Sequence, residues 1–284
     1  MTAAVAKLDT TNVVDVGIKV RRMDFQFNEN IPDFWYDQDA LLTLFLTALS
    51  ATFPEGEKQF IQSVRNFQDQ ITDPELKKQI RAFIGQEAHH SKEHDALNAM
   101  MKRKGFPVLR VEKRMTKMAQ WMRENWSRER QLANTVCAEH ITALMADFFM
   151  SKSPEELQKL HPDVQKIWAW HVIEETEHKA VAFDVYSQVV GDQWLRRSQM
   201  LLLTALFVAE TAISTTQLLR ATDQMGNWKM WLKGSRYFLG PRGMVWKLLP
   251  DYLDFYKKDF HPWQHQRVAE LNAMKRRYLA AEER

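Results

Sequence analysis

Two short motifs of the form Glu-x-x-His constrain most strongly how this chain folds. They begin at Glu87 and Glu175 and end at His90 and His178. Residues three apart project from one face of an α-helix, so each motif places a carboxylate beside an imidazole. Hydrophobic residues recur with helical spacing around both motifs, whereas runs of β-branched residues between turn signals are scarce. The sequence therefore predicts an all-α protein.

Turn and capping signals separate four long predicted helices in the first two-thirds of the chain. Asp73-Pro74 opens one of them, because proline suits a first helical turn, and Gly105 with Pro107 closes it. Pro54 predicts a kink inside the first helix. The four helices are expected over residues 37–70, 74–104, 111–150 and 162–190.

The four helices predict a ferritin-like four-helix bundle, and the remaining segments are expected to flank it. Residues 1–36 form an N-terminal arm, irregular apart from a short strand over residues 13–20. Residues 37–192 form the bundle with its metal site. Residues 193–284 form a C-terminal helical extension packed on the bundle, so that the whole chain is a single domain.

Each of the four predicted helices carries a glutamate on its apolar face. The neighbours of Glu57 at helical spacing include Phe53 and Val64, whereas those of Glu55 are mostly polar. A buried carboxylate without a partner is strongly destabilising, so four of them require a common cation. The candidate metal ligands on the four faces are Glu57, Glu87, His90, Glu139, Glu175 and His178.

This ligand set predicts a site for two metal ions. Two-metal helical bundles take one glutamate from each of two helices and Glu-x-x-His from each of the other two. Four carboxylates also balance the charge of two divalent cations. Carboxylate and imidazole ligands without thiolate favour iron or manganese over zinc or copper. We expect two iron ions, with manganese or a mixed pair as alternatives.

A simpler interpretation omits the metal. Glu57 could pair with Arg65 or Lys58, Glu139 could pair with His140, and Glu-x-x-His recurs by chance in acidic helices. That interpretation must account for four helices at once, so the sequence favours the metal site.

Further polar residues lie close to the candidate ligands. His171 precedes Glu175 by one helical turn, so it is either a seventh ligand or a histidine that donates to a ligand carboxylate. His94 shares the face of Glu87 and is expected to support a ligand, and Cys137 is expected to be a small core residue. Residues rotated off these faces, expected at the surface or behind the ligands, are His89, Glu93, Glu174, Glu177 and His140.

Composition narrows the partners and the compartment. A net charge of +3 without a clustered basic face predicts no nucleic-acid partner. A single cysteine permits no intrachain disulfide, and residues 1–17 lack the apolar segment of a secretory signal, which together favour the cytoplasm. The most apolar stretch, residues 200–219, is interpreted first as a buried helix and second as a peripheral membrane contact. Together with the aromatic segment 226–265, this stretch is also compatible with a homodimer interface or with the binding of an apolar substrate.

Several motifs give the chain a resemblance to a known family. They are VRRMD at 20–24, SxxFPxGE at 50–57, ExxH at 87–90, EH at 139–140, the stretch 171–178 and FHP at 260–262. With them the chain resembles a bacterial family described as predicted metal-dependent hydrolases, within the ferritin-like di-iron carboxylate superfamily. His171 also resembles the extra histidine ligand of ferritin-like arylamine N-oxygenases.

Three functions follow as expectations. The first is an O₂-dependent di-iron oxidoreductase that acts on a small apolar or aromatic substrate with an external electron donor. The second is a metal-dependent hydrolase, since two ions ~3.5–4 Å apart can activate water. The third is a non-enzymatic iron-binding protein. No catalytic residue beyond the metal ligands is predicted.

Overall fold

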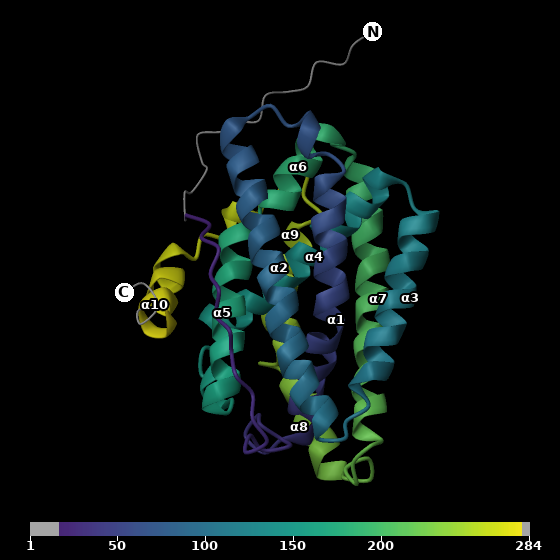
Figure 1. Ribbon diagram of the computed structural model, residues 1–284, viewed down its shortest axis with the longest axis vertical. Helices are drawn as coiled ribbons and strands as arrows, with labels where there is room; N and C mark the ends of the chain where they lie inside the picture. Colours follow the sequence, from purple (N-terminus) through teal and green to yellow (C-terminus); the bar gives the residue numbers. More distant parts are fainter. Residues whose placement is uncertain (1–16, 280–284) are drawn as a thin grey trace.

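A computed structural model describes residues 17–279 of the chain, and every regular element within them is helical (Figure 1). The predicted all-α class is therefore confirmed. The described residues contain one isolated β-bridge, between Tyr36 and Leu160. The short strand expected over residues 13–20 falls partly outside the described residues, and residues 17–20 belong to no strand.

Four long helices form the bundle. Each of them packs against two others in the cyclic order α1, α2, α5, α4. Capping residues fix their starts: the Asp39 carboxylate accepts from the Leu42 N–H, and the Asp73 carboxylate accepts from the Glu75 N–H. The bundle helices are α1 (Ala40–Arg65), α2 (Pro74–Arg103), α4 (Arg128–Asp147) and α5 (Pro162–His178).

The single helix expected over residues 111–150 is in fact two helices. Helix α3 (Val108–Asn125) is followed by Trp126, whose backbone is extended, and Ser127 then caps α4 by accepting from the Arg130 N–H. Neither glycine nor proline marks this break. Helix α3 packs outside the bundle against α1 and α2. The helix expected over 162–190 is likewise divided, because α5 ends at His178 and α6 (Val181–Val189) follows.

Helices of the C-terminal region contact the bundle, and the division of the chain into arm, bundle and extension within one domain remains a prediction. Helix α7 (Gln193–Leu219) lies against α1 and α4, α8 (Trp228–Leu239) against α1, α9 (Met244–Asp254) against α4, and α10 (Val268–Tyr278) against α5. Shorter turns complete the described chain: 3₁₀ turns at Gln68–Gln70, Leu157–Lys159 and Pro262–Gln264, and a π-helical turn at Phe148–Lys152.

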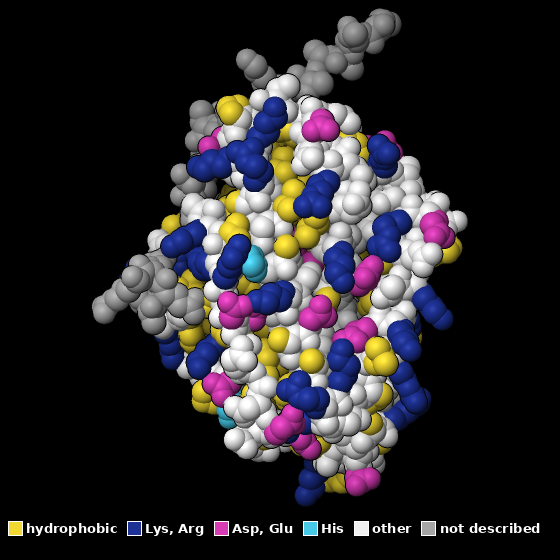
Figure 2. Space-filling view, in the orientation of Figure 1, with side chains coloured by type: hydrophobic (Ala, Val, Ile, Leu, Met, Phe, Trp, Pro, Cys, Tyr) yellow, Lys and Arg dark blue, Asp and Glu magenta, His cyan; other side chains and the backbone are white. Residues whose placement is uncertain are grey.

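Helix α7 differs from the buried helix that its composition suggested. By length and composition it is the one helix within residues 17–279 that could cross a membrane, yet only 17% of its most apolar window is buried. Apolar side chains therefore remain on its outer face. The face drawn in Figure 2 shows Lys and Arg side chains interspersed with Asp and Glu rather than gathered into one basic patch.

Candidate metal centre

The six predicted ligands meet in the middle of the bundle. Glu57 comes from α1, Glu139 from α4, and the two Glu-x-x-His motifs come from α2 and α5. All six residues are buried, none of them more than 2% exposed. Four helices that are distant in sequence thus place four carboxylates and two imidazoles in one interior space.

Three carboxylates surround the imidazole of His178. Its Nε2 lies 3.0 Å from Glu87 Oε1, 3.5 Å from Glu139 Oε2 and 3.6 Å from Glu175 Oε1. One donor atom from each of Glu87, Glu175 and His178 falls within a 4.8 Å cluster, which is close enough for one ion to contact all three. This cluster joins α2 to α5, with Glu139 approaching from α4.

A second cluster adjoins the first around His90. Donor atoms of Glu57, Glu87 and His90 lie within 4.8 Å of one another, and so do those of His90, His171 and Glu175. The Nδ1 atom of His90 lies 3.5 Å from Glu175 Oε1. Glu87 and Glu175 therefore take part in clusters around both histidines, which is the arrangement expected of carboxylates that bridge two ions.

Hydrogen bonds behind His171 determine its tautomer. The amide of Asn98 donates to the Ser50 carbonyl, so its Oδ1 faces and accepts from the Ser50 hydroxyl. The Ser50 oxygen then accepts from His94 Nδ1, and His94 Nε2 accepts from His171 Nδ1 at 3.1 Å. The remaining nitrogen of His171, Nε2, is left with a lone pair 3.4 Å from Glu175 Oε1.

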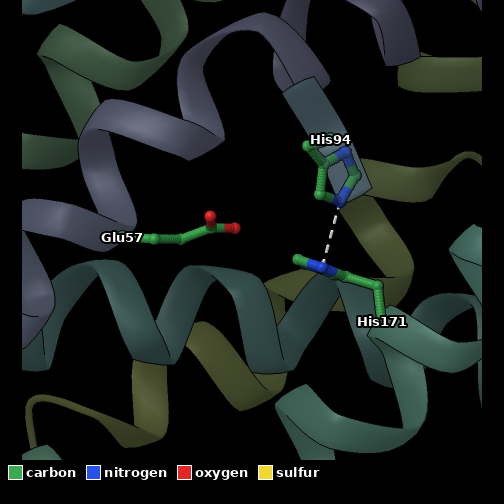
Figure 3. Close-up of side chains that lie close together, drawn as sticks. All are labelled: Glu57, His94 and His171. Atoms are coloured by element: carbon green, nitrogen blue, oxygen red, sulfur yellow. Dashed lines mark hydrogen bonds between the residues drawn. The ribbon is translucent and has the colours of Figure 1, made fainter. Parts of the chain in front are cut away.

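This tautomer gives His171 the geometry of a metal-binding residue. Burial and then the charge of His90 lower the pKa of His171 to about 3, and burial lowers that of His94 well below its usual value, so both rings are neutral. A lone pair that faces a carboxylate oxygen needs a cation between them. Figure 3 shows His94 hydrogen-bonded to His171 and the Glu57 carboxylate opposite the pair. His94 thus contacts the centre through His171.

A parallel arrangement supports His178. Its Nδ1 lies 2.9 Å from Gln86 Oε1, while the Gln86 amide nitrogen donates to Glu177 at 2.7 Å. The amide oxygen only accepts, so His178 Nδ1 carries the proton and Nε2 is directed at the carboxylates. On the other side, His90 Nε2 lies 3.2 Å from Glu174 Oε2. The residue before each motif glutamate thus contacts the histidine of the other motif.

Arg21 connects these supports, and its role was not predicted. It donates to Glu174 at 2.9 Å and to both oxygens of Glu177 at 2.9 and 2.8 Å. Burial opposes its charge, but Glu177 and Glu174 raise the pKa of Arg21 above its usual value. Lys275 adds an ion pair to Glu177 at 2.6 Å.

The residues expected at the surface or behind the ligands differ in their burial. Glu174 and Glu177 are buried at Arg21. Glu93 is also buried, and its carboxylate accepts from the backbone N–H groups of Asp24 and Phe25. His89 is only half-buried. Cys137 is a buried core residue, as expected.

Burial and mutual repulsion set the charge of the ligand side chains. Burial, followed by the charge of Glu87, raises the pKa of Glu57, and burial likewise raises the pKa of Glu139. Burial opposes the charge of His178, but Glu175 and Glu139 outweigh it and raise the pKa of that imidazole. A bound cation would balance the charge of these carboxylates and displace protons from them.

The donor atoms at the centre fit a divalent cation. Both carboxylate oxygens of Glu87 and of Glu139, together with Glu57 Oε1 and Glu175 Oε2, are buried without a hydrogen-bond partner. Buried polar atoms are almost always satisfied in native proteins, so this concentration of orphaned oxygens indicates a cation site.

The simpler pairing interpretation does not match the contacts. The Lys58 ammonium lies near Glu55, at 3.9 Å, and the Glu57 carboxylate instead accepts from the Ser91 hydroxyl at 2.8 Å. Glu139 turns toward His178, whereas the His140 ring packs against Phe255. Glu57 and Glu139 therefore lie at the centre and not in separate ion pairs.

An apolar pocket reaches the centre from the side of α3 and α7. Glu57, His171 and Glu175 form its inner end. Its walls are largely apolar and include Phe53, Phe60, Met115, Met118, Leu206 and Phe207. The pocket therefore reaches the centre beside His171.

Fold and donor atoms together define a helical protein with a buried carboxylate–histidine cluster that can hold divalent metal. The family model described as "Predicted metal-dependent hydrolase" matches residues 19–266, so the chain belongs to that family. No curated protein and no solved structure matches the chain. Membership confirms the resemblance to this family, whereas placement in the ferritin-like superfamily remains a prediction. The family description and the clusters both imply a divalent metal, without identifying it as iron.

Proposed function

We propose that this protein is a two-metal carboxylate enzyme that acts on an apolar substrate held in the pocket beside the centre. The observation that carries the proposal is the sharing of Glu87 and Glu175 between clusters around two different histidines. Glu57, His90 and His171 would complete one metal position, and Glu139 and His178 the other. The Glu and His ligands favour iron or manganese in both.

Metal-dependent hydrolysis is the reaction that the family description names. It was the second expectation from the sequence, and the comparisons agree with it better than with oxidation. Two ions can activate a water and hold a leaving group. A hydrolytic site also needs water at the metals and donors for the developing oxyanion, and the walls of this pocket are mostly apolar.

O₂-dependent oxidation is the reaction that the apolar lining of the pocket favours. Iron, when bound, would supply the reduction of O₂ with electrons from an external donor. Phe53, Phe60 and Phe207 exclude water from the substrate, which protects a reactive oxidant from side reactions. The hydrogen bond from His171 to His94 holds a proton at His171 Nδ1 and keeps Nε2 free to bind metal. A protein that only binds iron, without catalysis, would also not need a pocket at its metal centre.

Two matched variants separate these reactions. Protein loaded anaerobically with Fe(II) is mixed with O₂, and the rate of iron oxidation is compared among wild type, Glu57→Ala and Glu55→Ala. Glu57 faces the centre, whereas Glu55 faces Arg123 at 3.1 Å, so only Glu57→Ala is expected to slow oxidation. Equal rates in all three proteins would contradict the oxidation proposal.

The same three proteins test hydrolysis. We expect no metal-dependent release of p-nitrophenol from a p-nitrophenyl ester of a fatty acid in the absence of O₂. Turnover without O₂ that requires added metal, and that Glu57→Ala abolishes while Glu55→Ala retains, would establish hydrolysis in place of oxidation.

A further inference from the structure

An apolar stripe covers the outer face of α7. Trp194, Leu201, Ala205, Val208 and Ala212 recur at helical spacing and are all exposed, with Trp194 at 78%, Leu201 at 62% and Val208 at 59%. The stripe is about 27 Å long at 1.5 Å per residue. Large exposed apolar patches on soluble proteins mark interaction sites.

Charge is almost absent from the stripe, and exposed basic residues follow its C-terminal end. Between Arg197 and Arg220, the one charged residue is Glu210, which the guanidinium of Arg114 on α3 binds at 2.7 to 2.9 Å. Beyond Arg220, α8 exposes Trp228 at 66% together with Lys229. Residues 220–247 contain six Lys or Arg and one Asp, although the chain as a whole is only +3.

The stripe continues into the apolar pocket. Leu206 is 37% exposed on α7 and also lines the pocket that ends at His171 and Glu175. The same helix therefore presents apolar side chains to the outside and forms a wall of the route to the centre. Figure 1 shows α7 and α3 side by side along one flank of the molecule, with α8 at the lower end of α7.

We propose that this flank, the outer face of α7 with the exposed tryptophans of α8, docks on the surface of an anionic phospholipid bilayer. Apolar side chains would enter the acyl boundary, tryptophans would lie at the headgroup level, and the flanking basic residues would contact anionic headgroups. The docked orientation brings the Leu206 side of the pocket to the bilayer. Resting on the proposed function, we infer a substrate that partitions into membranes.

Charge distinguishes the bilayer from a second copy of the chain as the occupant. In a two-fold dimer with parallel α7 stripes, the same surface meets itself and the basic residues that follow the stripe from Arg220 would face one another. Like charges across an interface oppose association. An anionic headgroup layer instead complements these basic residues.

Flotation with vesicles tests the docking. Wild-type protein is mixed with vesicles of phosphatidylcholine alone or with phosphatidylglycerol, and the bound fraction is measured after centrifugation. We expect binding to the mixed vesicles that weakens with added salt. Ala205→Glu should lower the partition coefficient roughly tenfold, because it places a carboxylate in the stripe. Ala273→Glu makes the same change on exposed α10, on the opposite flank, and should bind as wild type.

Three results would overturn the proposal. These are wild-type protein that floats with neither vesicle, Ala205→Glu that floats as well as Ala273→Glu, or a wild-type dimer on a sizing column that Ala205→Glu converts to a monomer. Circular dichroism and thermal unfolding of both variants establish that they are folded. Flotation requires neither metal nor turnover, so its failure would leave the metal centre untouched.

Discussion

The side chain of Gln86 on α2 holds the imidazole of His178 on α5, with 2.9 Å between Oε1 and Nδ1. Glu174 on α5 approaches His90 on α2 in return, at 3.2 Å from Nε2. Each histidine is therefore supported by the helix that carries the other one. Supports of this kind fix the ring orientation of a metal-binding histidine and increase its basicity.

Replacing Gln86 should weaken metal binding without unfolding the bundle. Gln86→Leu removes the acceptor that keeps the His178 proton on Nδ1, and we expect metal affinity to fall about 10- to 100-fold by titration calorimetry. Gln79→Leu makes the same change two turns away on α2, where the side chain is half-buried, and should retain wild-type affinity. Equal affinities for the two variants would show that Gln86 does not position His178.

Arg21 should be required for stability as well as for the centre. Arg21→Gln leaves Glu174 and Glu177 buried with one cation fewer, and breaking a buried ion pair in this way typically costs about 3–5 kcal/mol. Arg22→Gln is the matched control because Arg22 is exposed. Urea unfolding of metal-free protein measures the difference, and similar losses in the two variants would contradict the account.

His140 should make the metal-free protein less stable in acid. Burial, and then the charge of His265, lower its pKa to about 3 in the folded chain. The unfolded chain, with an ordinary pKa near 6.5, binds the proton first, so stability is full above pH 6.5 and is lost as the pH falls toward 3. His140→Gln should remove roughly 2 kcal/mol of the loss between pH 6.5 and 5. An unchanged pH dependence in that variant would contradict the lowered pKa.

A larger side chain in the pocket should block the binding of apolar ligands without changing the binding of metal. Ala138 lines the pocket, so Ala138→Phe narrows it. We expect the variant to lose the fluorescence of bound N-phenyl-1-naphthylamine while its metal content stays at the wild-type level. Ala273→Phe on exposed α10 should change neither quantity. Unaltered dye binding in Ala138→Phe would mean that apolar ligands bind elsewhere.

Helical periodicity and the ligand spacing were sufficient to predict the bundle and the meeting of its six polar side chains. Glu57 and Glu55 were separated correctly because their neighbours at helical spacing differ. His171 was found one turn before Glu175, but its tautomer depends on Ser50 and His94. Contacts of this kind between helices cannot be predicted from residue spacing along the chain.

Other features depend on tertiary contacts or on weak local signals. Arg21 precedes the first helix, and only the fold brings it to Glu174. The break before α4 depends on the extended backbone of Trp126 and a serine cap, without glycine or proline. The apolar composition of α7 predicts a buried helix. Composition does not show which neighbours a helix has, so the exposure of its outer face could not be predicted.

The metal content of the purified protein tests the two-metal centre most directly. Protein prepared without added metal, and again after loading with Fe(II) or Mn(II), is dialysed and analysed for bound metal together with Glu175→Ala and Glu55→Ala. The account predicts two equivalents per chain in wild type and Glu55→Ala, and loss of metal in Glu175→Ala, whose carboxylate belongs to clusters around both His90 and His178. A wild-type protein that retains no metal after loading would contradict it.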